Sequence, residues 1–434
     1  MSPVEIGLIG VGFLLLLFFL GMPVSFSMAF IGWIGYCFLV SPMAGSKLFI
    51  RDIFTVFTSY PLSVIPAFVL MGSYAFASGI SERLYKAAYD IFGHLKGGLT
   101  VATVVTSAGF AAVCGSTSAT VATIGKIALP EMKRYKYGDT LATGCIATSA
   151  TLGILIPPST IFIVYGILTE QSIGKLFIAG VIPGLILALL LALTTILICY
   201  IKPKLGPPGP KTSWKEKIKS LSGVSEAIIL FGITMGGLFA GWFTPTQAGS
   251  IGAAGALLIG LIRKKINWRT FTTATKDGVL ISCMILFLIA GATIFGHFMA
   301  VTRIPFLLLE SAKKLSLSPT TFLTLICIFY IIGGCFMDAM ALVVLTVPFI
   351  FPIVTRLGYD PIWFGVIIVL VSELGVVTPP VGVNVYVLKG IAQEIPLETI
   401  FKGVMPFLGA IIITLIILIL FPDIATYLPK YIRW

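Results

Sequence analysis

Two proline pairs inside long apolar runs limit what this chain can fold into more than any other feature. Residues 153–159 read GILIPPS, and residues 375–381, 222 positions later, read GVVTPPV. A proline pair removes backbone donors and forces a helix to unwind. Inside a membrane such a break is tolerated only where it is buried in protein or lines a cavity. Matched breaks in two halves of a chain are the best sequence indication of a secondary transporter's binding site.

The composition places the chain in a membrane. Of its 434 residues, 58% are hydrophobic and only 11% are charged. Apolar runs of spanning length recur, for example at 6–20, 181–201 and 407–421. We therefore expect an all-α polytopic membrane protein. The first run has no basic flank before it and no small-residue cleavage site after it, so we expect a retained helix rather than a signal peptide.

The charge and the cysteines exclude other classes of protein. The formal net charge is +12, but the basic residues are scattered through loops between apolar runs, which favours membrane orientation over nucleic-acid binding. The seven cysteines show no metal-ligand spacing and no disulfide framework, and there are only two histidines. We predict no transition-metal site.

The offset of 222 positions extends beyond the proline pairs. Glycines and prolines, which dictate backbone shape, recur at it. The matched pairs include Gly10 with Gly232, Pro23 with Pro245, Pro130 with Pro352 and Gly153 with Gly375. We predict two structural repeats, residues 1–200 and 224–434, joined by a polar, proline- and lysine-rich linker at 201–223.

Both repeats can be divided in the same way. Each has two helices, a third helix, a short amphipathic arm, a helical hairpin too short to cross a membrane twice, a broken helix and a final helix. The predicted third helices lie near 60–78 and 279–300, the arms near 80–95 and 304–316, the hairpins near 97–130 and 320–352, and the broken helices near 139–168 and 361–390.

If both hairpins are re-entrant, each repeat crosses the membrane five times and the second repeat is inverted relative to the first. The positive-inside rule supports this topology, because it places twenty of the 29 lysines and arginines on the inner side. The linker is then cytoplasmic, and both termini lie outside.

The turn of the first hairpin combines hydroxyl side chains with a helix break. Residues 114–120 read CGSTSAT, with Ser116 and Ser118 at the centre. Hydroxyl oxygens and the carbonyls freed between Gly153 and Pro158 are oxygen ligands of the kind that hold Na⁺ in transporters. The alternative is that the small residues only let helices pack closely.

The second hairpin carries a carboxylate at the matching position. Asp338 is offset by 222 from Ser116, and a carboxylate at membrane depth costs about 2.5–3.5 kcal/mol, which indicates function. Glu373 is either a coupling carboxylate or a residue hydrogen-bonded between helices. Arg303 either grips a substrate carboxylate with paired hydrogen bonds or is solvated on the outer arm.

Several segments together resemble the large membrane subunit of TRAP (tripartite ATP-independent periplasmic) transporters, the DctM-like permeases, along essentially the whole chain. They are residues 21–26 (GMPVSF), 115–120 (GSTSAT), 153–159, 243–248 (FTPTQA), 335–338 (CFMD) and 374–382. The resemblance implies an elevator-type transporter, similar to the ion transporter superfamily, in which a domain holding both hairpins slides against a scaffold. It also implies Na⁺ coupling, a separate small membrane subunit, a periplasmic binding protein and a bacterial inner-membrane location.

The resemblance also implies site residues. One Na⁺ site would use Ser116, Ser118, Gly153, Ile156 and Pro158. The residues of a second Na⁺ site would be Gly334, Gly375, Thr378 and Val381, and those nearest the substrate would be Ser116, Ser159, Asp338 and Arg303.

We therefore predict Na⁺-driven import of a small organic anion, a carboxylate or a sulfonate. Sialic acid and C4-dicarboxylates are both compatible, and the sequence does not choose between them. The alternatives are a stand-alone Na⁺/dicarboxylate symporter, a channel and a membrane-embedded enzyme. The usual catalytic motifs, such as His-Glu-x-x-His and Gly-x-Ser-x-Gly, are not found in the sequence.

Overall fold

The computed structural model describes residues 1–304, 306–307 and 318–431, and within these ranges every regular element is a helix. The predicted all-α fold is confirmed. The α-helices before the linker are α1 (Pro3–Phe19), α2 (Val24–Leu39), α3 (Pro42–Thr58), α4 (Val64–Ala77), α5 (Ile80–Phe92), α6 (Gly98–Cys114), α7 (Thr117–Arg134), α8 (Asp139–Ser149), α9 (Leu152–Leu155), α10 (Thr160–Thr169) and α11 (Ile173–Ile201).

The linker contains a 3₁₀ turn, Pro203–Leu205, and one short α-helix, and the remaining helices follow. They are α12 (Trp214–Leu221), α13 (Ser225–Phe231), α14 (Gly237–Phe239), α15 (Pro245–Ile262), α16 (Trp268–Thr302), α18 (Pro319–Phe336), α19 (Ala339–Arg356), α20 (Pro361–Val377), α21 (Val383–Ile391), α22 (Leu397–Leu420) and α23 (Asp423–Thr426).

The described helices are long and apolar enough for a polytopic membrane protein. Seven could cross a membrane by length and composition, and nine could do so if each of two bent pairs is one span. The bent pairs are α3 with α4, at 56°, and α8–α9 with α10, at 40°. The second bend lies at the first predicted break.

Local sequence signals fix many of the helix ends. Ser2, Ser213 and Thr244 form capping boxes with the glutamate or glutamine three residues later. Gly115, with φ +66°, ends α6 in the left-handed conformation that glycine adopts without penalty. This residue therefore allows the tight turn between α6 and α7.

Glycines let several helices touch backbone to backbone. A Cβ on Gly144 of α8 would lie 2.1 Å from the carbonyl oxygen of Gly403 in α22, and one on Gly32 of α2 would lie 2.7 Å from the Cα of Phe295 in α16. Contacts of this kind are the main way in which membrane helices associate, because lipid supplies no hydrophobic force between them. They join α8 to α22 and α2 to α16.

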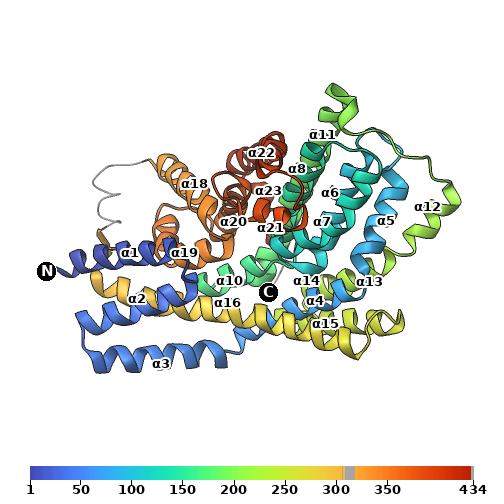
Figure 1. The fold of residues 1–434 in the computed structure, drawn as a ribbon. Coiled ribbons are helices and arrows are strands. Elements are labelled where there is room, and N and C mark those ends of the chain that lie inside the picture. Colours follow the sequence, from blue (N-terminus) through green and yellow to red (C-terminus); the bar gives the residue numbers. More distant parts are fainter. Residues whose placement is uncertain (305, 308–317, 432–434) are drawn as a thin grey trace.

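Figure 1 shows two groups of helices. The long helices α2, α3, α15 and α16 run along the lower side of the view. The hairpin helices α6–α7 and α18–α19 gather above them, together with α8, α10, α20 and α21. The elements predicted to carry the site are therefore grouped on one side of the long helices.

The observed helices differ from the sequence predictions in three places. The first is α3, a 17-residue helix at 42–58, where we expected a connection. The second is α16, which begins at Trp268, eleven residues before the predicted third helix of the second half, and continues without a break. The third is a π-helical segment, Gly232–Gly236, which interrupts the first helix after the linker.

The predicted topology is only partly described. The hairpin helices α18 and α19 have 18 residues each, enough for a span by length, so the hairpin is longer than we expected. Most of the predicted arm at 304–316 lies outside the described residues. The inverted relation of the two repeats and the re-entrant hairpins stay predictions.

Candidate functional site

The first hairpin docks its tip onto the first broken helix. Ser116 begins α7 as its N-cap, and its hydroxyl accepts a hydrogen bond from the Ala119 amide at 3.4 Å. The carbonyl of Gly115 accepts two hydrogen bonds from Thr160, from its amide at 3.3 Å and from its hydroxyl at 2.9 Å. The tip is therefore fixed to the residue that starts α10.

Three of the predicted ligands of the first Na⁺ site, Ser116, Gly153 and Pro158, lie at this junction. Pro157 and Pro158 have no N–H, so the carbonyls of Gly153 and Ile154 lose their helical donors. A Cβ on Gly153 would lie 3.0 Å from the Ser116 carbonyl oxygen. A Cβ on Gly115 would lie 2.6 Å from the Pro158 carbonyl oxygen. The break and the hairpin tip thus meet at their backbones.

The second hairpin docks in the same manner. The Gly382 amide donates to the Cys335 carbonyl at 3.3 Å, just after the second break. A Cβ on Gly375 would lie 2.7 Å from the Cα of Gly334, so these two predicted ligands are in backbone contact. The hydroxyl of Thr378 donates to the Leu374 carbonyl at 2.5 Å, inside its own helix end. Hard carbonyl and hydroxyl oxygens make up both junctions, which fits an alkali cation.

A cavity of about 860 Å³ lies between the two hairpin tips. Ser116, Thr117 and Ser118 line it from the first tip, and Asp338 lines it from the second. Residues of α4 and α16 form another part of the wall, among them Ser73 and Ala274. The cavity therefore lies where the hairpins meet α4 and α16.

Two carboxylates face this cavity in different ways. Asp338 is exposed to it and caps α19, accepting a hydrogen bond from the Met340 amide at 2.9 Å. Glu373 of α20 is only 2% exposed, and its Oε1 accepts a hydrogen bond from the Thr117 hydroxyl at 3.0 Å. Its Oε2 has no hydrogen-bond partner. Of the two alternatives for Glu373, the hydrogen bond between helices is present at one oxygen, and the coupling role stays a prediction.

Exposed charges line another part of the same cavity. Lys126 lies on α7, and Arg269 and Asp277 lie on α16. The cavity therefore combines three carboxylates, those of Asp338, Glu373 and Asp277, with the two cationic side chains.

Two predicted substrate residues are not part of this cavity. Ser159 is fully buried and caps α10, accepting from the Phe162 amide at 3.3 Å. Arg303 ends α16 with φ +61° and lines a separate cavity of about 570 Å³. Pro348 and Phe349 of α19 also line that second cavity. The structure thus brings Ser116 and Asp338 together but places Ser159 and Arg303 apart from them.

Sequence reasoning missed Thr117, Lys126 and Arg269. Thr117 belongs to the hydroxyl cluster at 116–120, but its bond to Glu373 joins residues 256 positions apart, and no local pattern announces that contact. Lys126 and Arg269 were used only as orientation charges. Helical spacing could have predicted Lys126, because this residue lies about two turns after Ser118 on α7 and so lies on the same side of the helix as that predicted ligand.

Comparisons with known proteins show the family of this chain. The family model described as tripartite ATP-independent periplasmic transporter, DctM component, matches residues 11–424. The chain belongs to the DctM family. It is 35% identical over 395 residues to the C4-dicarboxylate TRAP transporter large permease protein DctM of Pseudomonas aeruginosa, covering 91% of this chain and 92% of that protein.

Other relatives of this DctM-family chain differ in the substrate they are named for. It is 32% identical to the sialic acid TRAP transporter large permease protein SiaM of Vibrio cholerae, covering 95% of this chain and 96% of that one. Among solved structures, the YdaH transporter of Alcanivorax borkumensis has a TM-score of 0.62 at 14% identity, covering 90% of this chain and 89% of that chain. That likeness concerns the fold alone.

Proposed function

We propose that this TRAP large permease imports a small organic anion by Na⁺ coupling and an elevator movement. The supporting observation is the meeting of two hairpin tips, each docked on a proline-broken helix, at one cavity that contains Ser116 and Asp338. The hairpins and broken helices would move together, because each tip is hydrogen-bonded to the residue after its break. The long helices α2, α3, α15 and α16 would form the scaffold.

The proposed ion sites are the two junctions between tip and break. In the first, Ser116, Ser118, Gly153, Ile156 and Pro158 would hold one Na⁺. The ligands proposed for the second are Gly334, Gly375, Thr378 and Val381. Inward movement of each cation gains about 2.3 kcal/mol per 100 mV, so two cations outweigh a singly charged anion, whereas a dicarboxylate dianion needs three.

The substrate would bind between Ser116 and Asp338. When Asp338 is ionised, an anion beside it needs a bound cation or a neutral part of the substrate as neighbour. Lys126 and Arg269 would attract the anion elsewhere along the cavity. Glu373 would couple the two halves through Thr117.

The proposed roles of Arg303 and Ser159 both require movement. Pro348 and Phe349 line the Arg303 cavity, so a shift of α19 would change access to that side chain. Ser159 would reach a substrate only if the start of α10 opened. We therefore propose contact with these residues in another stage of the cycle.

The test is uptake into proteoliposomes that contain this chain with a small TRAP membrane subunit, supplied with a periplasmic binding protein loaded with its acid. Uptake should require an inward Na⁺ gradient and should be absent with an equal K⁺ gradient. Uptake without Na⁺ would contradict coupling. Uptake by this chain alone, without either partner, would favour the stand-alone symporter. Release of a chemically altered acid would favour an enzyme.

A further inference from the structure

A short helix in the linker has an apolar face that nothing in the described chain covers. Trp214, Ile218 and Leu221 of α12 are 79%, 67% and 48% exposed. Their spacing of four and three residues puts them on one face of the helix. The half-buried residues of α12 are Lys217, which borders the stripe, and Ser220, which lies beyond Lys217, and α12 packs against α5. The apolar stripe therefore points away from the protein.

The position of α12 keeps it at the membrane surface. The candidate span Trp214–Phe239 begins with α12 itself, which residues 222–224 join to α13, and α11, a 29-residue apolar span, ends at Ile201. Three residues reach at most about 11 Å when fully extended. In Figure 1, α12 lies at the edge of the molecule, at the opposite end of the view from the N-terminus. An exposed apolar stripe held there is within reach of lipid.

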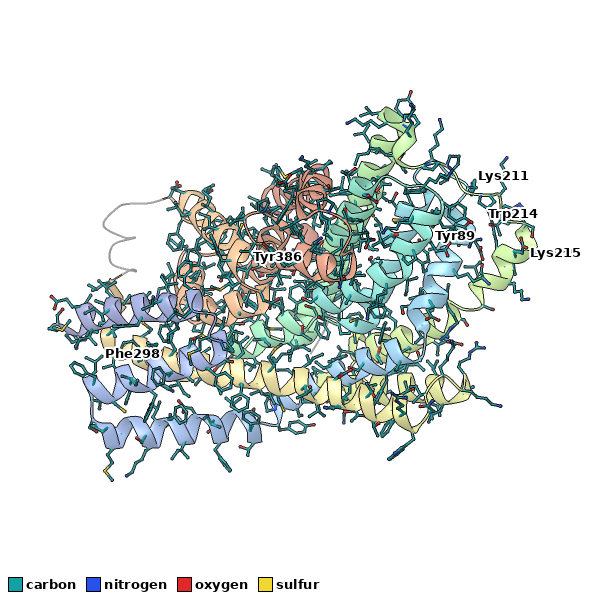
Figure 2. The ribbon with its side chains drawn as sticks, in the orientation of Figure 1. Tyr89, Lys211, Trp214, Lys215, Phe298 and Tyr386 are labelled. Atoms are coloured by element: carbon teal, nitrogen blue, oxygen red, sulfur yellow. The ribbon has the colours of Figure 1, made fainter. Side chains whose placement is uncertain are left out.

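The charges around the stripe are almost all positive. Residues 202–221 contain six lysines and a single acidic residue, Glu216, which is bonded to Ser213 in the capping box. Lys211, Lys215 and Lys219 are exposed, and no salt bridge pairs them within the part of the chain that the structure describes. Figure 2 shows Lys211, Trp214 and Lys215 at the outer edge of the molecule.

Tryptophan and lysine are placed as in an interfacial helix. The Lys217 ammonium lies 5.1 Å from the centre of the Trp214 ring, within cation–π range. Lys215 and Lys219 are four residues apart on the side of the helix next to the stripe. An amphipathic helix with an aromatic anchor and flanking lysines is the pattern that binds anionic membrane surfaces.

We propose that α12, together with Lys211, anchors the linker to the membrane by binding anionic phospholipid headgroups. The apolar stripe would enter the headgroup boundary, and the lysines would contact lipid phosphates. Charge complementarity favours a lipid surface over a protein partner, because the stripe is narrow and the lysines flank it. This site is separate from the transport cavity, so it stands whether or not the proposed Na⁺ coupling is correct.

The first experiment measures where Trp214 lies. The whole chain is placed in phosphatidylcholine nanodiscs containing equal fractions of brominated phosphatidylglycerol or brominated phosphatidylcholine, whose bromine quenches nearby tryptophan. The chain has six tryptophans, so the signal of Trp214 is the difference between wild type and Trp214→Phe. We expect this signal to be quenched, and more strongly by the brominated phosphatidylglycerol.

Two outcomes would overturn the proposal. No quenching of the Trp214 signal would place α12 in water or under a protein partner. Equal quenching by both brominated lipids would remove the claim of anionic recognition.

The second experiment tests the lysines. Native mass spectrometry would measure the phosphatidylglycerol retained by wild type and by Lys215→Gln/Lys219→Gln. Each basic residue near an anionic surface contributes about fivefold to binding, so the double variant should lose more than about tenfold. The matched control, Lys47→Gln/Lys175→Gln, removes two charges from α3 and α11 and should keep its retained lipid. Equal retention in the test and control variants would contradict the proposal.

Discussion

The two broken helices share a backbone design but lie in different surroundings. Every residue from Thr151 to Thr160 is buried, and Ile156, the most exposed of the break, is 9% exposed. In the second break, Pro379 and Pro380 are exposed. Helix α11 accounts for part of this difference, because a Cβ on its Gly180 would lie 2.3 Å from the Leu155 carbonyl oxygen. One sequence signature therefore produces an enclosed junction and an open one.

The tips of the two hairpins differ in charge as well. Ser116 and Asp338 hold the same position in the predicted repeats, and both cap the second helix of their hairpin. Of these two tip residues, only Asp338 has an ionisable side chain. The enclosed junction would thus serve mainly to hold a cation through neutral oxygens, whereas the open one would bind a charged group from the cavity.

The largest expected effect comes from removing that charge. Asp338→Ala should abolish uptake in the reconstituted system, by roughly 100-fold or more, because loss of one member of a charged contact costs about 2–5 kcal/mol. Ser116→Ala should reduce uptake much less, since a neutral hydrogen bond contributes about 0.5–1.5 kcal/mol. Initial rates at equal amounts of inserted protein make the measurement.

Asp338→Asn is the control for the helix cap. Asparagine keeps the N-cap of α19 but lacks the charge, so uptake should fall as in Asp338→Ala while stability stays near wild type. Near-normal uptake in either variant would show that transport does not need the Asp338 carboxylate. The two hairpin tips would then not differ in function because of their charge.

The glycines at the two junctions should be the next most sensitive positions. Gly375→Ala would push a Cβ to 2.6 Å from the Ile331 carbonyl oxygen, and Gly153→Ala would bring one to 2.8 Å from the Thr120 hydroxyl. Overpacking of this kind costs about 1–3 kcal/mol. We expect the larger loss at Gly375, because its neighbours are backbone atoms that cannot rotate away.

Thermal unfolding in detergent tests this order. Gly409→Ala on α22 is the matched control, since a Cβ there meets nothing within 4 Å, and it should be neutral or stabilising. Equal unfolding temperatures for Gly375→Ala and Gly409→Ala would show that the second hairpin and its break are not in contact.

The contact between the halves predicts a loss of similar size. Thr117→Val keeps the shape of the side chain but leaves Glu373 with both oxygens unpartnered, at a cost of about 1–3 kcal/mol. Thr195→Val is the control, because the Thr195 hydroxyl is buried and already lacks a partner. A lower unfolding temperature only for Thr117→Val is the expected result. If both substitutions behave alike, the Thr117–Glu373 bond does not hold the halves together.

The sequence predicted the breaks and tips well because proline and glycine act locally. Pro157, Pro158, Pro379 and Pro380 remove donors wherever they occur, so both helices had to end near them. The burial of one break and the exposure of the other depend on packing by α11, which leaves no local trace. The position of Arg303 also could not be predicted from local sequence, because the distance between Arg303 and Asp338 depends on how α16 and α19 cross. Helix α3 was missed because Lys47, Arg51 and Asp52 interrupt its apolar pattern.

The smallest expected effect concerns how each broken helix restarts. Ser159 begins α10 through its side chain, so Ser159→Ala should cost about 1 kcal/mol, and Ser159→Gly only a few tenths. After the second break, α21 begins at Gly382, which has φ +65° and no side-chain cap. The start of this helix therefore depends on the backbone conformation of glycine and not on a capping side chain. There, Gly382→Ala should cost about 1–2 kcal/mol through backbone strain. Ser372→Ala removes a buried hydroxyl without a partner and should be neutral in the same unfolding assay. Equal losses of stability in Ser159→Ala and Ser372→Ala would mean that the enclosed break depends on packing alone. The expected order would show that a capping side chain starts the helix after the first break and a glycine conformation starts the helix after the second.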